Sequence, residues 1–253
     1  MYQNKNGLKM SQKKQLKAGV FGVLSVLLQA CATTSPYDEV SDPLESVNRV
    51  MFKFNDKLDR VLLKPVAEYY KDYMPDPVRT GVGNFFGNIY EPIVIVNGVL
   101  QWKPKQAAND TMRFGFNTVF GIAGLIDVST PWGMEKHDED FGQTFGAWGF
   151  GEGWYLVLPL LGPSTLRDAA GLPPTWLLDP IKYQTNGWVR LGAYSLLTVN
   201  ERAKLLSASQ ILDAGSIDAY LQVRTAYRQI RWFDIHDGNP PEPDFFDDEL
   251  FAD

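Results

Sequence analysis

The sequence is poor in the residues that build disulfide frameworks and metal sites. Its 253 residues include one cysteine, Cys31, and two histidines. One cysteine excludes a disulfide within the chain, whatever the redox compartment. Two histidines also leave few choices for a catalytic base. A fold of this length must therefore be held by its core and by non-covalent polar contacts.

Basic charge is scarce once the first thirty residues are set aside. Those residues carry five lysines and no acid, which leaves 19 basic against 30 acidic side chains in the rest. A body this acidic is not attracted to phosphate backbones or anionic lipid surfaces at long range. Nucleic acid is therefore not an expected partner, and membrane binding would need another cause.

The sequence also lacks an apolar run of the eighteen or more residues needed to cross a bilayer. A shorter run, Ala18 to Leu28, follows the N-terminal lysines and precedes Gln29-Ala30-Cys31. A charged region, an apolar region of this length and a small residue before the cut are typical of a secretory signal peptide. We therefore expect residues 1–30 to be removed, with Met1 and Met10 both open as the start.

Cys31 lies at the expected cleavage point, where "LQAC" resembles the bacterial lipobox. The alternative, a buried free thiol, is the usual place for a lone cysteine, but the polar residues after Cys31 have no core pattern. We predict that Cys31 is lipidated, that residues 31–41 form a polar tether, and that several acyl chains hold the protein firmly at a membrane. Ala32, which is not an aspartate, indicates the outer membrane.

Motifs for nucleotide binding and for nucleophilic catalysis are absent. The glycine-rich segment Gly149-Phe150-Gly151-Glu152-Gly153 lacks the third spacing of a dinucleotide loop, and no P-loop lysine follows a glycine run. Ser164 does not lie in a nucleophile elbow. Ser164, His137 and Asp168 are the residue types of a catalytic triad, but no sequence motif links them. His137 lies among the four acids of 135–140, and the spacing of these residues matches no metal-ligand pattern. We expect no catalytic residue, no cofactor and no metal.

Prolines divide the chain after the tether and predict a series of short to medium helices. Asp42-Pro43-Leu44-Glu45 has the layout of a capping box. A proline inside a helix loses a hydrogen bond and clashes with the preceding turn, so further helix starts are predicted where similar pairs recur. These pairs are Lys64-Pro65, Asp76-Pro77, Glu91-Pro92 and Lys103-Pro104. Two later helices are predicted, one through Trp188 to Leu212 and one capped by Ser216.

Two stretches, 93–100 and 114–128, are apolar nearly all round. They are either core helices of an ordinary globule or a helical hairpin lying within one membrane leaflet. Six of the seven tryptophans fall between residues 102 and 188, and tryptophan favours the boundary of headgroups and tails. Residues 234–253, with eight acids and no lysine or arginine, predict a disordered tail after one helical domain at 42–233.

Several blocks together resemble the MlaA (VacJ) lipoproteins of the Gram-negative outer membrane. The resemblance covers about residues 41–230. The blocks are "SDPLESVNRVMFKFNDKLDRVLLKPVAEYY", "VGNFFGNIYEPIVIVNGVLQ", "RFGFNTVFGIAGLIDVST", "FGQTFGAWGFGEGWYLVLPLLGPSTLRD" and "DAYLQVRTAYRQ".

The resemblance implies an all-α fold, a flat ring of helices in one leaflet of the outer membrane around an amphipathic channel. It implies an anchor on the periplasmic face and removal of phospholipid from the outer leaflet. It also implies two partners, a trimeric porin and a soluble periplasmic lipid carrier.

Polar residues inside the apolar blocks are candidates to line such a channel, because a bare headgroup charge in hydrocarbon is costly. Arg113 or Arg167 could pair with a lipid phosphate. For each candidate, a helix cap or an internal salt bridge is the alternative. The candidates are Asn84, Asn88, Asn97, Arg113, Asn117, Asp127, Arg167 and Asp168. A membrane-anchored lipid hydrolase and a structural envelope lipoprotein stay open as other functions.

Overall fold

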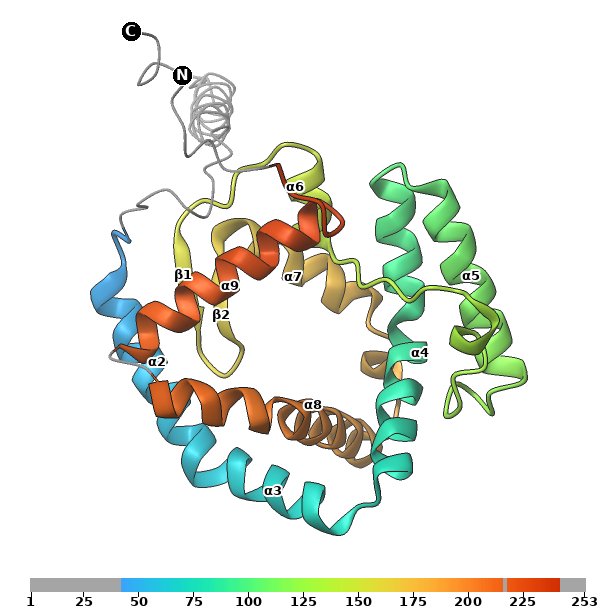
Figure 1. Ribbon diagram of the computed structural model, residues 1–253, viewed down its shortest axis with the longest axis horizontal. Coiled ribbons are helices and arrows are strands. Elements are labelled where there is room, and N and C mark those ends of the chain that lie inside the picture. The colour runs from blue at the N-terminus through green and yellow to red at the C-terminus, as the bar shows by residue number, and fades with distance from the viewer. Residues whose placement is uncertain (1–41, 216–217, 242–253) are drawn as a thin grey trace, which may run out of the picture.

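The computed structural model describes residues 42–215 and 218–241 as a ring of helices with one small β-hairpin (Figure 1). The predicted signal peptide, tether and lipidation site at Cys31 lie outside these residues, as do Ser216 and residues 242–253. In chain order the elements are α2 Glu45–Leu58, the π-helical turn η1 Asp59–Leu63, α3 Lys64–Tyr73, α4 Asp76–Leu100, α5 Pro104–Val119, the 3-10 turn η2 Thr130–Trp132, α6 Phe141–Ala147, β1 Tyr155–Leu158, β2 Gly162–Thr165, α7 Leu166–Leu178, the 3-10 turn η3 Pro180–Tyr183, α8 Gly187–Gly215 and α9 Ala219–Ile235.

The ring follows the chain around most of its circumference. α2, η1 and α3 form one continuous arc, α4 forms the next side, and α6, α7 and α9 lie opposite α8 (Figure 1). α8 packs against both α3 and α4, which closes the circle. α5 folds back along the outer side of α4 as a helical hairpin. The all-α ring fold predicted from the sequence is confirmed.

Proline marks helix starts at some of the predicted pairs and not at others. Asp76-Pro77 begins α4, and Pro104 begins α5, as predicted. Pro92 instead lies inside α4, so the predicted start at Glu91-Pro92 is wrong. The helix continues because the residues after Pro92 bury a face that packs on α5, and this packing offsets the roughly 3 kcal/mol cost of an internal proline.

Pro65 does not follow a corner either, because α2 and α3 are joined by the π turn η1. The N–H of Lys64 bonds to the carbonyl of Asp59, five residues back. This wider turn accommodates the proline ring, which in a regular helix would clash with the carbonyl four residues before it. The predicted start at Lys64-Pro65 is therefore the restart of α-helical geometry within a continuous arc.

The chain on both sides of the glycine-rich segment forms regular structure that the sequence did not suggest. The glycines between residues 142 and 153 favour a loop, but Phe141–Ala147 is helical (α6), and the carboxylate of Asp140 caps its first turn by accepting from the N–H of Gln143 at 2.8 Å. Tyr155–Leu158 pairs with Gly162–Thr165 as an antiparallel hairpin in the register Tyr155↔Thr165. Pro159 lies in the turn of this hairpin.

The last helix extends past residue 234, where we expected the disordered tail to begin. α9 runs to Ile235, and its N-cap is Asp218, whose carboxylate accepts from the N–H groups of Tyr220 and Leu221. Residues 236–238 form a turn, and residues 239–241 follow without regular structure. In the described part of the chain, the acidic segment thus starts inside a packed helix.

The interior of the ring wall is polar to an unusual degree. The largest fully buried side chains are Asn97, Asn200, Thr144, Thr165, Asp110 and Ser129. Buried hydrophobic residues form small clusters, one of Ala67, Ala203 and Leu206 between α3 and α8. The apolar stripe of α2 is largely exposed at Val47, Phe54 and Leu58, whereas Asn48 of the same helix is buried. Hydrogen bonds and ion pairs inside the wall therefore provide much of the stabilisation that a hydrophobic core provides in other proteins.

Candidate functional site: a ring opening with polar walls

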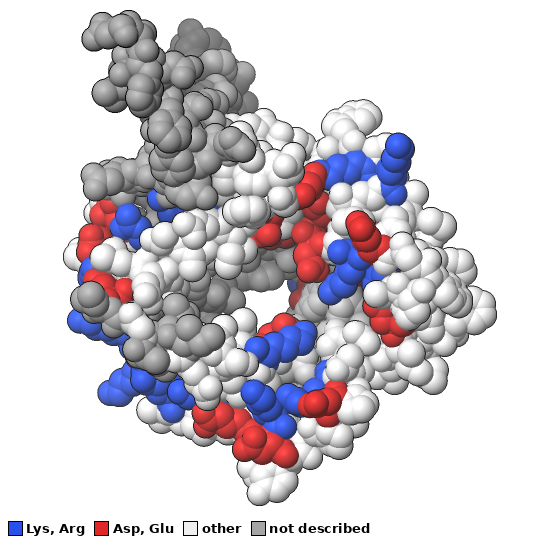
Figure 2. Space-filling model, in the orientation of Figure 1, with Lys and Arg blue, Asp and Glu red and all other residues white. Residues whose placement is uncertain are grey.

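The ring encloses an opening, which we call the central opening. α8, α4, α7, α9 and the hairpin surround it in Figure 1, and the space-filling view in Figure 2 shows that side chains do not close it. Acidic and basic side chains both reach its rim in that view. An opening bounded by polar and apolar side chains could accommodate a molecule that has both a charged and an apolar part.

Five of the predicted channel residues lie together where α4, α5 and the loop 120–130 meet. They line a recess that we call the Arg113 recess. Its lining residues are Asn84, Gly87, Asn88, Glu91, Arg113, Asn117, Asp127 and Lys136. The 3.6-residue period places Asn84, Asn88 and Glu91 on one side of α4, and Arg113 and Asn117 on one side of α5, so the two helices of the hairpin bring them together.

Many polar atoms of the Arg113 recess bond to each other or to the loop 120–130, whereas Asn88 Oδ1, Glu91 Oε1 and Arg113 Nε are buried without a hydrogen-bond partner. Arg113, 2% exposed, donates from Nη2 to Asp127 Oδ2 at 3.0 Å and from Nη1 to Thr130 Oγ1 at 3.1 Å. Asn117 Oδ1 accepts from the N–H groups of Val128 and Ser129 at 2.9 and 3.1 Å. These bonds fix the loop to α5. The internal salt bridge that we weighed against a lipid contact is thus present at Arg113.

Asp127 is the charged partner that holds Arg113. Partial burial by itself would raise the pKa of Asp127, but hydrogen bonds from Thr130 and Arg113 outweigh it and lower the pKa to about 2. Asp127 is therefore ionised at every physiological pH. Asn84 donates to the carbonyl of Leu125 at 3.4 Å, and Asn88 donates to Thr118 Oγ1 at 3.0 Å.

Two buried acids of this region were missed in the sequence. Glu91 is 5% exposed, and its Oε1 lies 4.0 Å from Arg113 Nε. Burial, aided by the nearby charge of Asp110, raises the pKa of Glu91 to about 7. Asp110 Oδ1 lies 2.7 Å from His137 Nδ1. The sequence did contain one signal for a buried acid, because Glu91 is the only acid next to the apolar run of α4.

Asn97 lies apart from the Arg113 recess. It is fully buried on α4, donates from Nδ2 to the carbonyl of Ile93 at 2.9 Å and accepts from Thr144 Oγ1 of α6 at 2.7 Å. Its side chain therefore joins two elements of the wall.

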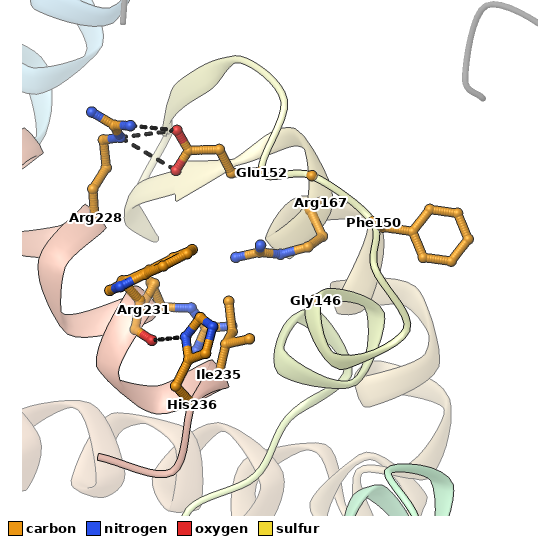
Figure 3. A pocket seen from close by; sticks show the side chains of 10 residues that line it. Gly146, Phe150, Glu152, Arg167, Arg228, Arg231, Ile235 and His236 are labelled. Atoms are coloured by element: carbon orange, nitrogen blue, oxygen red, sulfur yellow. Dashed lines mark hydrogen bonds and ion pairs between the residues drawn. The ribbon is translucent and has the colours of Figure 1, made fainter. Parts of the chain in front are cut away.

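Arg167 and Asp168 belong to a second polar cluster, where α6, α7 and α9 meet. Arg167 lines a recess between the segment after α6 and α9, where it points inward while Phe150 points away (Figure 3). Arg228 of α9 bonds to Glu152 across the same recess, with Nε 3.0 Å from Oε1. The two predicted arginines, Arg113 and Arg167, are thus in different recesses.

Asp168 is the centre of this second cluster. Arg231 donates to its Oδ1 from Nη2 at 3.1 Å, Tyr227 donates to its Oδ2 at 2.7 Å, and Arg167 donates to its Oδ1. Burial by itself would raise the pKa of Asp168, but the charges of Arg231 and Arg167 outweigh it and lower the pKa. A Cβ at Gly142 would lie 2.4 Å from Asp168 Oδ1, so residue 142 must be glycine for α6 to pack this closely on Asp168.

The three residues of the possible triad have other partners. His137 bonds to Asp110, and Asp168 bonds to arginines and a tyrosine. Ser164 is buried and donates to the carbonyl of Thr165 at 3.3 Å. None of these contacts activates the hydroxyl of Ser164 as a nucleophile.

The hairpin is held at the ring by two asparagines of α2 that the sequence did not suggest. Asn48 donates to the carbonyl of Tyr155 at 2.9 Å and accepts from the N–H of Val157 at 2.9 Å. Seven residues later, Asn55 bonds in the same way to Leu158 and Leu160. The turn, with Leu160 and Leu161 exposed, reaches into the ring (Figure 1). The hairpin thus adds apolar side chains inside a largely polar wall.

The outer hairpin of α4 and α5, with the loop that follows, exposes many large apolar side chains. In the described residues these include Val96, Val99, Trp102, Met112, Val119, Phe120, Ile122, Leu125, Ile126 and Trp132. Such a surface exceeds the scattered exposure of ordinary monomers and is typical of a membrane or protein contact. Within the part of the chain that the structure describes, no helix combines the length and the hydropathy required to traverse a bilayer.

Comparisons with known proteins agree with this architecture. A family model described as "MlaA lipoprotein" matches residues 40–234. The "Intermembrane phospholipid transport system lipoprotein MlaA" of Escherichia coli (strain K12) is 37% identical over 227 residues, which cover 85% of this chain and 87% of that protein. An "Uncharacterized protein" of Rickettsia bellii is 36% identical over 194 residues, 76% of each chain.

One solved structure has the same fold. It is described as "Structural basis for maintenance of bacterial outer membrane lipid asymmetry", and its chain is 38% identical with a TM-score of 0.69, covering 78% of this chain and 100% of that chain. The family model, the curated relatives and the shared ring all lead to one conclusion. This chain belongs to the MlaA lipoprotein family.

Proposed function

We propose that this protein removes phospholipid from the outer leaflet of the outer membrane through the central opening and passes it to a soluble periplasmic carrier. The observation that carries the proposal is an opening through a ring whose buried groups are polar, in a member of a family named for phospholipid transport. A phospholipid crossing between leaflets must keep its headgroup solvated, because a bare charge in hydrocarbon costs several kcal/mol or more. Polar groups at the rim lower that barrier.

The apolar exterior supports a place within one leaflet. The exposed surface of α4, α5 and loop 120–130 would be costly in water at about 25 cal/mol per Å² of apolar area, and is stable in lipid. Lipidation at Cys31 would keep the ring at the periplasmic face of the outer membrane. A trimeric porin beside the ring and the carrier below it complete the proposed route, in which direction comes from the partners.

The geometry does not favour the two alternatives. A lipid hydrolase needs an accessible, activated nucleophile, and Ser164 is buried and bonded to backbone. A purely structural lipoprotein predicts a sealed molecule, and Figure 2 shows an opening.

The test is the amount of outer-leaflet phospholipid in living cells, measured by labelling with a membrane-impermeant amine reagent. Deletion of the gene should raise the label, and the wild-type gene should restore it. Cys31→Ala should fail to restore it, because without lipidation at Cys31 the ring is not delivered to the outer membrane, even though its apolar surface can bind lipid. An unchanged label on deletion would mean that the transport proposal is wrong.

Passage through the opening needs its own variant. Leu160→Trp with Leu161→Trp adds bulk at the hairpin turn, inside the ring, and should impair removal. Val119→Trp adds a bulky side chain at the exposed end of α5, outside the ring, and is the control. Asn117→Leu is unsuitable, because Asn117 holds loop 120–130 and its loss would disturb the fold. Normal removal by the double variant would refute the route but not the transport.

A further inference from the structure

A separate polar recess lies where α3, α4 and α8 meet, and we call it the corner recess. It measures about 370 Å³ and is lined by Asp76, Arg79, Thr80, Asn200, Ala203 and Lys204. None of these residues belongs to the Arg113 recess or to the cluster at Asp168. α4 and α8 also bound the central opening, and charged side chains lie over α8 at its rim (Figure 2).

The corner recess contains buried donors that have no protein acceptor. Asn200 is 2% exposed, and its Nδ2 has no hydrogen-bond partner. Tyr70 donates to Asn200 Oδ1 at 3.1 Å, which orients the amide. The Nε of Arg79 is also buried without an acceptor. A buried donor left unpaired costs about 1–3 kcal/mol, so two in one recess indicate a ligand that supplies acceptors.

Two nitrogen atoms of the recess, from Lys204 and Asn200, lie against one glycine of α4. A Cβ placed on Gly83 would lie 3.1 Å from Lys204 Nζ and 3.3 Å from Asn200 Nδ2. Glycine within a helix costs roughly 0.5–1 kcal/mol relative to alanine. Glycine at residue 83 therefore allows these two donors, both of which line the recess, to approach the backbone of α4 closely.

The charges of the recess favour an anion. Arg79 and Lys204 line it with one acid, Asp76. Asp76 pairs with Arg79, but 84% of its side chain is exposed, and the partner of Lys204, Glu201, is also half exposed. Exposed pairs of this kind contribute only about 0–1 kcal/mol, so an entering anion can displace them. The first turn of α4 adds the partial positive charge of a helix N-terminus.

We propose that the corner recess binds a phosphate group, with Lys204 and Arg79 as charged donors and Asn200 as a neutral donor. A phosphate offers several acceptor oxygens and matches this mixed set of donors. The proposal rests on the proposed function for one point, the source of the phosphate, which is then the headgroup of a phospholipid passing the rim. Free phosphate has the same chemistry and is distinguished by experiment.

The experiment uses the full chain in a non-ionic detergent and follows the side-chain amide of Asn200 by NMR. Dihexanoyl-phosphatidylglycerol, which is soluble, is titrated in one arm, inorganic phosphate in a second and dihexanoylglycerol, which lacks phosphate, in a third. The short-chain phospholipid should shift the Asn200 signal in a saturable way, and dihexanoylglycerol should not. Binding of inorganic phosphate as tight as that of the lipid would overturn the lipid source.

Variants connect the shift to the recess. Lys204→Gln and Gly83→Ala should each weaken binding about tenfold or more, the first by removing a charge-assisted bond and the second because its methyl group would displace the nitrogens of Lys204 and Asn200. Lys57→Gln removes the same charge from exposed α2 and should leave binding within about twofold. An unmoved Asn200 signal, or equal weakening by Lys204→Gln and Lys57→Gln, would overturn the site.

The cell assay separates this inference from the transport proposal. If Lys204→Gln abolishes lipid binding in detergent while cells still clear the outer leaflet, the transport proposal stands and the headgroup role of the recess does not. If deletion of the gene has no effect on the outer leaflet while the recess binds phosphate, the phosphate site stands, and the transport proposal and the headgroup role that rests on it do not.

Discussion

Asp168 carries an unusual number of contacts for a single carboxylate. Two arginines and one tyrosine donate to it, and its own N–H is bonded to Thr165. Removing one member of a buried charge network leaves the other charges without compensation. The residue thus holds α7 and α9 together at one side of the ring.

We expect Asp168→Asn to lower the free energy of unfolding by about 3 kcal/mol, because Arg167 and Arg231 would remain buried with less negative charge. Urea unfolding in detergent measures the loss. Asp138→Asn is the control, since 85% of that side chain is exposed and its change should stay within about 0.5 kcal/mol. Equal losses in both variants would show that the network does not stabilise the ring.

Glu91 should make stability depend on pH near neutrality. Its pKa is about 7 in the folded protein and 4.5 in the unfolded chain, so the folded state holds the extra proton between these values. Stability therefore falls as pH rises from 4.5 to 7, by about 3 kcal/mol in total. Asp127 and Asp168 have the opposite sign, because their lowered pKa values cost stability only as the pH falls below about 4.

Glu91→Gln removes the titrating group while keeping its shape. The variant should match the wild type at pH 5, where Glu91 is neutral, and should be more stable at pH 8. Urea midpoints at several pH values between 5 and 8 give the comparison. A wild-type midpoint that does not fall relative to the variant over this range would contradict an elevated pKa at Glu91.

At the scale of elements, the loop after α5 depends on tight backbone packing. Gly124 has a φ of +86°, and a Cβ there would lie 2.3 Å from Asn88 Cβ on α4. Gly133 has nearly the same φ, +82°, but a Cβ would contact nothing within 4 Å. The pair separates backbone strain from crowding.

Gly133→Ala should cost about 1–2 kcal/mol, the price of a left-handed alanine, and Gly124→Ala should cost clearly more. The additional loss comes from separating loop 120–130 from α4. Thermal unfolding of both variants in the same detergent measures the difference. If Gly124→Ala is no less stable than Gly133→Ala, the loop does not pack on α4 as described.

Helices with local signals could be predicted from the sequence, and contacts between distant elements could not. The proline at the start of α5 and the long apolar pattern of α8 were sufficient for those elements. Pro92 was misleading, because tertiary packing of α4 outweighs a local penalty. The bonds of Asn48 span more than a hundred residues to β1, and no local pattern encodes them.

The candidate site shows the same limit. Arg113, Asn117 and Asp127 were chosen as polar residues in apolar blocks, and the fold does bring them together. Their hydrogen bonds depend on the position of the backbone at the end of loop 120–130, and the sequence does not specify that position. The corner recess was missed because Lys204 and Asn200 occupy an ordinary polar part of α8, and only the approach of Gly83 makes them notable.

For the whole molecule, the exposed apolar surface predicts membrane binding that does not need the lipid anchor. Cys31→Ala protein in detergent should bind to phospholipid vesicles when the detergent is removed. Adding Ile122→Asp and Ile126→Asp should lower the bound fraction about tenfold or more, because two exposed apolar side chains are lost and two charges are gained.

The matched control adds Ser46→Asp and Gln184→Asp, which place the same charges at exposed polar positions. Co-sedimentation with vesicles measures all three proteins. Equal loss of binding in both double variants would attribute the effect to net charge, and the loop 120–130 would then not be a membrane surface.

The polar interior of the ring wall also has a thermodynamic consequence. Unfolding of an ordinary domain raises the heat capacity by about 12–15 cal/mol/K per residue, because apolar side chains leave a dry core for water. Here the largest fully buried side chains are amides, hydroxyls and a carboxylate, and many large apolar side chains already face outward. Exposing polar groups lowers the heat capacity. The free energy of unfolding of this ring should therefore change little with temperature over a wide range. Cooling should lower it less than it lowers that of a protein with a large hydrophobic core.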